Sequence, residues 1–194
     1  MEKKVNNRIK ILNAAWKLFE EKGYEETTVD EIIEATNTSK GTFYHYFKSK
    51  EDLLSLFSYI FDERYEELSK KLDVDMNSFD KLMVLCDECF STIENDYSLE
   101  LVARMYSSHL FSKNSKHLLD KNRIYYKLLR NVIAEGQQRG HIRDDLSPAE
   151  IIKAYTIAER GLIYDWCVCN GEYSLRDYGC KMMKMYLVQI KETE

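Results

Sequence analysis

The chain has 194 residues, of which 44% are hydrophobic and 31% are charged, a balance that is typical of globular proteins and excludes a disordered chain. Its net charge of −5 excludes a protein that binds polyanions over its whole surface. No apolar run approaches the roughly 18 residues of a membrane span, so no membrane partner is expected.

The first residues and the cysteines both indicate a cytoplasmic protein. The N-terminal sequence MEKKVNNRIK lacks the apolar core of a signal peptide. The five cysteines are an odd number in a chain too large to need disulfide cross-links, and reduced thiols are the simplest explanation.

The pattern of breaks predicts an all-α fold of about nine helices. A single proline, Pro148, and seven glycines leave few breaks, and Val and Ile do not alternate with polar residues. The first predicted helix begins at Arg8, carries apolar residues at helical spacing and stops at Gly23. Residues 1–7 are expected to form a frayed basic arm.

A tight turn between two short helices is predicted over residues 28–46. Thr28 lies three residues before Glu31, which is the capping-box pattern that begins a helix. Asparagine is the commonest residue other than glycine in the left-handed backbone conformation, so Asn37 can make the turn. Ser39 caps the second helix. This is the order of parts in a helix-turn-helix.

The second helix of the pair has the chemistry of a DNA-reading surface. From Ser39 to Lys50 there are three lysines and a histidine and no carboxylate. Lysine can reach guanine acceptors or phosphate, and threonine suits thymine or phosphate. An ordinary helical hairpin with a solvated charged face is the alternative. The candidate DNA-binding residues are Thr28, Ser39, Lys40, Gly41, Thr42, Tyr44, His45 and Lys50.

Helical periodicity continues to the end of the chain. Ser49 with Asp52 repeats the capping-box pattern and predicts a connector helix that continues to about Lys71. Ser147 followed by Pro148 is an N-cap with proline at the first helical position. The other helices are predicted over residues 79–93, 99–111, 116–139, 148–169 and 174–190.

The string KILNAAWKLFEEKGYEETTVDEIIEATNTSKGTFYHYFKSKEDLL closely resembles the DNA-binding domain of the TetR/AcrR family of bacterial regulators. The resemblance covers about residues 8–57, and SKGTFYHYFKSKEDLL is its most specific part. The chain departs from the usual pattern at residues 36–38, where Thr-Asn-Thr replaces a common Ala-Gly-Val, so the tilt of the second helix and the operator that it reads are not implied by the resemblance.

The resemblance implies a helix-turn-helix DNA-binding domain over residues 1–50 and a helical ligand-binding and dimerisation domain over residues 51–194. It implies a homodimer on a palindromic double-stranded DNA operator, with base contacts at Ser39, Lys40 and Gly41 and phosphate contacts at the other five candidate residues. It also implies an unknown small-molecule effector, no cofactor, and a bacterial protein that associates with the nucleoid.

The last two predicted helices carry more apolar residues than one buried face requires, which favours a dimer interface there. The family, too, usually dimerises through its final two helices. The alternative is that all these residues pack in the core of one subunit. The candidate interface residues are Ile152, Tyr155, Leu162, Met183, Tyr186 and Leu187.

Aromatic residues with polar tips and adaptable methionines in the middle helices suit a mostly apolar ligand fixed by a few hydrogen bonds. Core packing is the alternative for each of them. The candidate pocket residues are Cys86, Phe90, Met105, Tyr106, His109, Tyr125, Tyr126, Leu129 and Trp166.

Four cysteines in two short motifs, at positions 86, 89, 167 and 169, match the number of ligands in a tetrahedral metal site. Cys167 and Cys169 point to different sides of a helix, so inert thiols are favoured and no metal site is predicted.

The favoured function is a ligand-responsive transcriptional repressor. A DNA-binding protein of the same fold without small-molecule control, either dependent on a co-repressor or architectural, is the alternative. The sequence contains no phosphate-binding glycine loop, no HExxH and no nucleophile–base motif, so an enzyme is not predicted.

Overall fold

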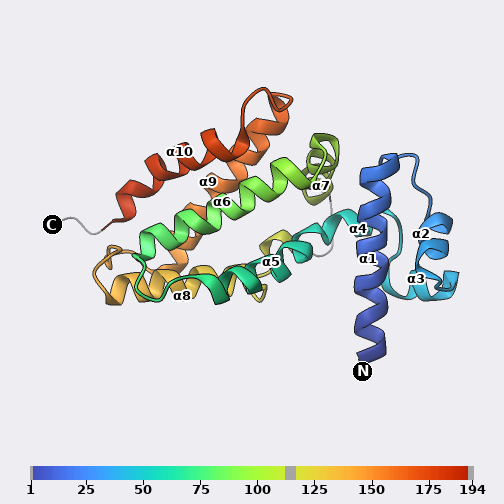
Figure 1. Cartoon of the computed structure of the whole chain (residues 1–194), viewed down its shortest axis with the longest axis horizontal. Helices are drawn as coiled ribbons and strands as arrows, with labels where there is room; N and C mark the ends of the chain where they lie inside the picture. The colour runs from blue at the N-terminus through green and yellow to red at the C-terminus, as the bar shows by residue number, and fades with distance from the viewer. Residues whose placement is uncertain (1, 112–116, 192–194) are drawn as a thin grey trace. The chain divides into compact units, whose positions relative to one another are not determined.

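A computed structural model describes residues 2–111 and 117–191. Over these ranges the chain forms ten α-helices and two 3-10 helices, and its only β-type pairing is one isolated bridge between Ile142 and Lys191. The all-α prediction is confirmed. The helices, labelled in Figure 1, are α1 Glu2–Lys22, α2 Val29–Thr36, α3 Lys40–Tyr46, α4 Glu51–Ser55, α5 Phe57–Lys71, α6 Ser78–Asp96, α7 Leu99–Phe111, α8 Ile124–Gln138, α9 Pro148–Val168 and α10 Leu175–Leu187, with 3-10 helices at His117–Leu119 and Val188–Ile190.

The predicted connector helix is wrong in two details. The Ser49–Asp52 capping box does not form, because Asp52 accepts the Lys48 backbone N–H at 2.7 Å and the helix starts at Glu51. The connector is also two helices, α4 and α5. They part at Leu56, whose N–H bonds the carbonyls of residues 53 and 54 in a tight turn.

Two other predicted helix starts were also wrong. α1 begins at Glu2, so residues 2–7 are helical where a frayed arm was predicted, and residue 1 lies outside the described ranges. The helix predicted from residue 116, also outside them, begins at Ile124. Before it, the Asp120 carboxylate accepts the Asn122 N–H at 2.9 Å and turns the chain.

By compactness the chain divides into two units. Unit 1 comprises residues 1–60 and 100–119, and unit 2 comprises residues 61–99 and 120–194. The predicted functional boundary after residue 50 lies inside unit 1 and remains a prediction.

In unit 1, α1 packs on α2, and α2 packs on α3. The apolar stripe of α1 is buried there, with Ile32, Phe43 and Phe47 from the following segment. The rings of Phe43 and Phe47, one helical turn apart, have centroids 5.6 Å from each other. This side of α3 is therefore fixed in the core, and its opposite side is turned to solvent.

In unit 2, α6 packs against α8 and α10, and α9 packs against the same two helices (Figure 1). Leu82, Leu85 and Phe90 of α6 are fully buried. Gly179 lets α10 lie close to α6, because a Cβ at this position would be only 2.7 Å from the Phe90 ring.

Candidate nucleic-acid interface

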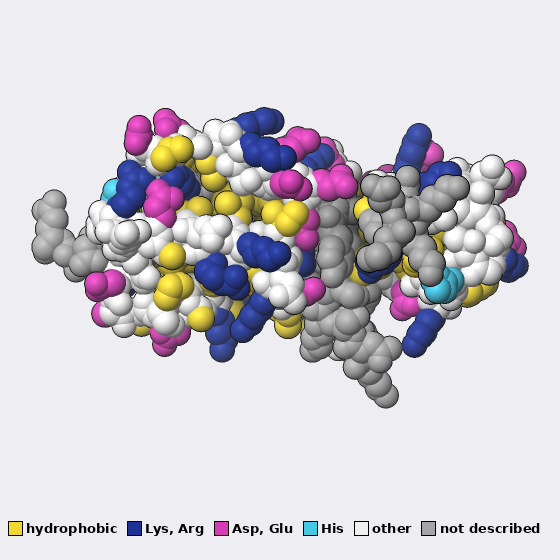
Figure 2. All heavy atoms as spheres, turned by 90° about the horizontal axis from the view of Figure 1, so that it is seen from below, with side chains coloured by type: hydrophobic (Ala, Val, Ile, Leu, Met, Phe, Trp, Pro, Cys, Tyr) yellow, Lys and Arg dark blue, Asp and Glu magenta, His cyan; other side chains and the backbone are white. Residues whose placement is uncertain are grey.

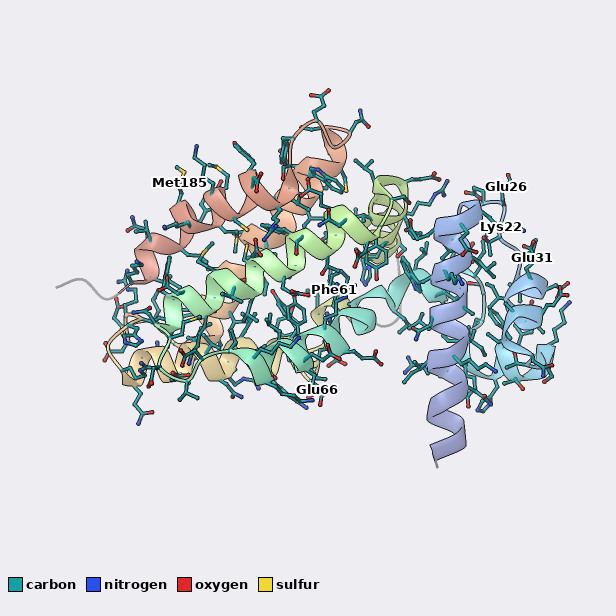
Figure 3. All side chains as sticks on the ribbon, viewed as in Figure 1. Lys22, Glu26, Glu31, Phe61, Glu66 and Met185 are labelled. Carbon is teal, nitrogen blue, oxygen red and sulfur yellow. The ribbon has the colours of Figure 1, made fainter. Side chains whose placement is uncertain are left out.

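α2 begins with the predicted capping box. The Thr28 hydroxyl accepts the Glu31 N–H at 3.3 Å, and the Glu31 carboxylate accepts the Thr28 N–H at 2.8 Å. Lys22 also pairs with Glu31, and their side chains face each other in Figure 3. Hydrogen bonds from Lys22 and then Thr28 lower the pKa of Glu31 to about 2. The Glu31 carboxylate is thus held both by Thr28 at the start of α2 and by Lys22 of α1, and this ties the start of α2 to α1.

The turn between α2 and α3 is made by Asn37, in left-handed backbone with φ 48° and ψ 46°. Its N–H bonds the carbonyls of Ile33 and Glu34. On either side, the hydroxyls of Thr36 and Thr38 bond each other at 2.8 Å, and Thr36 also donates to the Ile32 carbonyl. The three residues that depart from the family pattern therefore close the turn with hydrogen bonds of their own.

Ser39 caps α3 and accepts the Thr42 N–H at 3.0 Å, while the two hydroxyls lie 2.8 Å apart. The Ser39 and Thr42 side chains are therefore held in place by hydrogen bonds within the first turn of α3, and their two hydroxyl oxygens have fixed positions. Of the eight predicted DNA contacts, Thr42 and Lys50 are partly buried and the other six are exposed, namely Thr28, Ser39, Lys40, Gly41, Tyr44 and His45.

Lys40, the predicted base-reading side chain, pairs with Asp30 of α2 at 2.9 Å. The hydrogen bond and charge of Asp30 raise the pKa of Lys40. Both side chains are more than half exposed, so the pair is weak and can exchange for a nucleic-acid acceptor.

Lys50 does not extend into solvent like the other candidates. Its ammonium group donates to the backbone carbonyls of Tyr24 at 2.6 Å, Thr27 at 3.0 Å and Glu25 at 3.3 Å. It also lies 4.2 Å from the centre of the Tyr24 ring. Sequence reasoning missed this role because the carbonyl groups lie 23–26 residues earlier and backbone acceptors leave no signature in a sequence.

The nine predicted pocket residues fall in both units. Met105, Tyr106 and His109 belong to unit 1, and the other six, Cys86, Phe90, Tyr125, Tyr126, Leu129 and Trp166, belong to unit 2. All are buried except the partly exposed Tyr106. Tyr125 and Tyr126 meet edge to face at 5.2 Å, and the Trp166 ring donates to the Tyr173 carbonyl at 3.0 Å.

Unit 2 also contains a buried polar cluster that the sequence analysis missed. The Tyr125 hydroxyl donates to Glu159 of α9 at 2.6 Å. The other Glu159 oxygen has no hydrogen-bond partner of ordinary geometry among the described residues, although the Cys89 thiol is close to the carboxyl. Burial raises the pKa of Glu159 to about 7. Its position could have given a signal, since it follows buried Tyr155 by one helical turn.

A buried ion pair completes this cluster. Arg123 binds both oxygens of Asp62, at 3.0 and 3.2 Å, and the Asp62 carboxylate also accepts the Tyr125 N–H at 3.4 Å. The rings of Tyr65 and Tyr125 lie 5.0 Å apart beside it. Charge, hydroxyl and aromatic groups thus converge in the interior of unit 2.

Four of the six predicted interface residues, Tyr155, Leu162, Met183 and Leu187, are buried within the chain itself. Ile152 is partly exposed and Tyr186 is exposed. The exposed apolar row of α9 runs instead through Ile157, Gly161, Tyr164 and Val168, at intervals of three or four residues. The exposed apolar residues of α10 include Tyr178 and Met185, and Met185 points outward in Figure 3.

Apolar side chains also reach the surface between basic ones on the face shown in Figure 2. None of the described helices is long and apolar enough to span a membrane. Within the described ranges, no three His, Cys, Asp or Glu side chains gather as metal ligands would.

Two family profiles match the chain. "Bacterial regulatory proteins, tetR family" matches residues 11–56, and "YsiA-like protein, C-terminal region" matches residues 57–189. A relative, the fatty acid metabolism regulator protein of Bacillus subtilis (strain 168), is 26% identical over 147 residues, which are 75% of this chain and 76% of that protein.

Solved structures share the fold. FadR from Bacillus subtilis in complex with stearoyl-CoA aligns with a TM-score of 0.70 at 23% identity, over 94% of this chain and 98% of that one. Thermus thermophilus FadR in complex with lauroyl-CoA aligns with a TM-score of 0.67 at 20% identity, over 93% of each chain.

Proposed function

Because the chain belongs to the tetR family of bacterial regulatory proteins, we propose that it represses transcription as a homodimer on a palindromic operator and is released by a small, mostly apolar effector. The observation that carries the proposal is the orientation of α3. Its aromatic side is buried at Phe43 and Phe47, and its polar side, which has no carboxylate, is exposed.

On this proposal α3 enters the major groove with its N-terminal end toward the bases. Lys40 leaves Asp30 and binds guanine acceptors. No other part of the chain within the described ranges covers Gly41, since an added Cβ would meet nothing closer than the Ser39 hydroxyl at 3.8 Å. Because Gly41 has no side chain, the helix backbone can approach the duplex at this point. Tyr44 and His45 contact phosphates, and the capped start of α2 at Thr28 adds backbone donors for a further phosphate.

The same proposal assigns the dimer interface to the exposed apolar rows of α9 and α10. Ile157, Tyr164 and Val168 are 53–60% exposed in the single chain, and apolar rows of this kind mark surfaces that another protein covers. Gly161 lies within the α9 row, and a Cβ there would meet nothing within 4 Å. A helix of the second copy can therefore approach α9 closely at that point.

For the effector, the first class to test is fatty acyl-CoA thioesters. Two structural neighbours were solved with such molecules, and the C-terminal family match covers residues 57–189. The apolar and aromatic interior of unit 2 suits an acyl chain. The proposal assigns the protein no catalytic activity and places it in the cytoplasm with the nucleoid, where its DNA lies.

The proposal is tested by fluorescence anisotropy with DNA from both sides of the gene. Lys40→Ala is compared with Lys127→Ala, an exposed lysine of α8. Lys40→Ala should weaken operator binding by about tenfold or more and relax specificity at one base pair in each half-site, because each bidentate base contact supplies about 1–3 kcal/mol. Lys127→Ala should bind as the unmodified protein does. Equal affinity of the protein for operator and unrelated DNA would contradict the proposal.

A further inference from the structure

Two cysteines from distant parts of the sequence meet in unit 2. The Sγ atoms of Cys86 in α6 and Cys180 in α10 are 3.9 Å apart, and all five cysteines of the chain are free thiols. A disulfide requires an S–S distance of about 2.05 Å, so a small movement of two side chains would join them. We propose that Cys86 and Cys180 form a dithiol site that hydroperoxides oxidise to an intramolecular disulfide.

The packing around the pair keeps the two helices in place. Gly179, the neighbour of Cys180, brings α10 close to α6 at the Phe90 ring. Arg176, one turn before Cys180, binds both oxygens of Asp87 in α6, at 2.7 and 2.9 Å. Both contacts come from residues before Cys180 in α10 and after Cys86 in α6, so they set the spacing of the two helices directly beside the thiol pair.

A third contact, made by Glu94, holds the start of α10. The Glu94 carboxylate of α6 accepts the Ser174 hydroxyl at 3.1 Å and the Arg176 N–H at 2.9 Å. The polar contacts and the thiol pair thus lie along the same side of α6, and α10 is held there over about two turns.

The two thiols differ in the way that this oxidation requires. Cys180 is partly exposed, whereas Cys86 is fully buried. The Cys86 thiol, and more weakly Arg176, lower the pKa of Cys180, while burial raises the pKa of Cys86. Partial burial of Cys180, and then Asp87 at 3.9 Å from its sulfur, act on this pKa in the opposite direction. Cys180 is therefore the thiol that attacks, and Cys86 is the one that resolves.

The chemistry balances with a hydroperoxide as the oxidant. The Cys180 thiolate attacks the terminal peroxide oxygen, an S–O bond forms, the O–O bond breaks, and the leaving alkoxide takes a proton to become an alcohol. The sulfur of Cys86 then attacks the sulfenic acid at Cys180, the S–S bond forms and the S–O bond breaks. The hydroxide leaves as water with the Cys86 proton.

The site stays accessible in the proposed dimer. Cys180 lies in a row with Arg176 and Lys184, four residues to either side, whereas Tyr178 and Met185 occupy another face of α10. Because Cys180 is partly exposed and lies off the apolar rows, a second copy that covers those rows would leave it open to an oxidant. The inference does not depend on DNA binding.

Peptide mapping of the full chain tests the proposal. The protein is treated with cumene hydroperoxide, free thiols are alkylated, and the digest is analysed by mass spectrometry without reduction. A Cys86–Cys180 linked peptide should be the main product, and dithiothreitol should reverse it. Cys167→Ser, a partly exposed position in α9, is the matched control and should give the same linked peptide.

Two variants separate the roles of the thiols. Cys180→Ser should leave Cys86 unmodified, and Cys86→Ala should leave a sulfenic acid on Cys180 that a 1,3-dione traps; Cys86→Ser is used if the alanine variant does not fold. The proposal is overturned if the unmodified protein gives no linked peptide, gives only irreversible acids at Cys180, or links other cysteines first.

Discussion

At the scale of single residues, the most informative side chain is Lys50, which binds three carbonyls of the loop that precedes Thr28. A lysine in the helix-turn-helix region suggests a contact with a DNA phosphate. Here, however, the N–H groups of the Lys50 ammonium already donate to backbone carbonyls of the protein itself. Its effect on DNA binding would then be indirect, through the position of the α2 N-terminus, and not through charge.

The first prediction separates these two roles. Lys50→Ala should lower the free energy of unfolding by about 1–2 kcal/mol, because hydrogen bonds to a charged group are lost. It should weaken operator binding without changing the salt dependence. Lys48→Ala, at an exposed neighbouring position, is the control and should leave stability unchanged. A salt slope reduced by about one in Lys50→Ala would instead show a lost phosphate contact.

The second prediction concerns Glu159, whose pKa is raised to about 7 by burial. The unfolded carboxyl loses its proton near pH 4.5, while the folded one keeps it to about pH 7, so stability falls as the pH rises through this window. The loss amounts to about 3 kcal/mol by the linkage relation.

Glu159→Gln keeps the hydrogen bond from Tyr125 and cannot ionise. Urea unfolding of this variant should show a flatter stability profile between pH 4.5 and 7 and greater stability at pH 8. A profile identical to that of the unmodified protein would mean that the carboxyl titrates normally.

At the scale of elements, local side-chain chemistry predicted three of the four expected N-terminal caps. Capping at Thr28, Ser39 and Ser147 is present as predicted, because these caps are formed by residues three apart. The Ser49 cap was wrong because Asp52 bonds the backbone of Lys48 instead. Periodicity located the helices, but it could not show that Leu56 divides the connector, since that residue remains in phase with the buried side.

The third prediction concerns the turn at Asn37. Asn37→Gly should fold with little change in stability, because glycine adopts the left-handed backbone without strain. Asn37→Val should lose about 1–2 kcal/mol, since a β-branched residue is disfavoured there. Thermal unfolding measures both. If the valine variant is as stable as the unmodified protein, the turn has another conformation.

At the scale of the whole molecule, the sequence could show that α9 has two apolar rows but not which row faces its own core. Tyr155 and Leu162 are buried, while Ile157 and Tyr164, two residues further on in each case, are exposed. The choice depends on how α8 and α10 pack against α9, which is a long-range property. The buried Asp62–Arg123 pair escaped notice for the same reason, since its partners are 61 residues apart.

The fourth prediction tests the proposed interface. Tyr164→Glu should give a monomer in sedimentation, because a charge would be buried between two apolar helices. Operator affinity should fall by about 100-fold or more, since the two half-sites would no longer be bound together. Val74→Glu, which changes a 79% exposed residue before α6, should remain a dimer. A dimeric Tyr164→Glu would move the interface elsewhere.

The Tyr24 ring has one further consequence. The Lys50 ammonium lies 4.2 Å from its centre, and the Arg104 guanidinium of α7, which also pairs with Glu25 at 2.7 Å, lies 5.3 Å from it. None of these four residues belongs to the exposed side of α3. Substitutions around this ring could thus alter how tightly the protein holds DNA while the base sequence it selects stays the same. Strength of repression and choice of target would then be separately heritable traits.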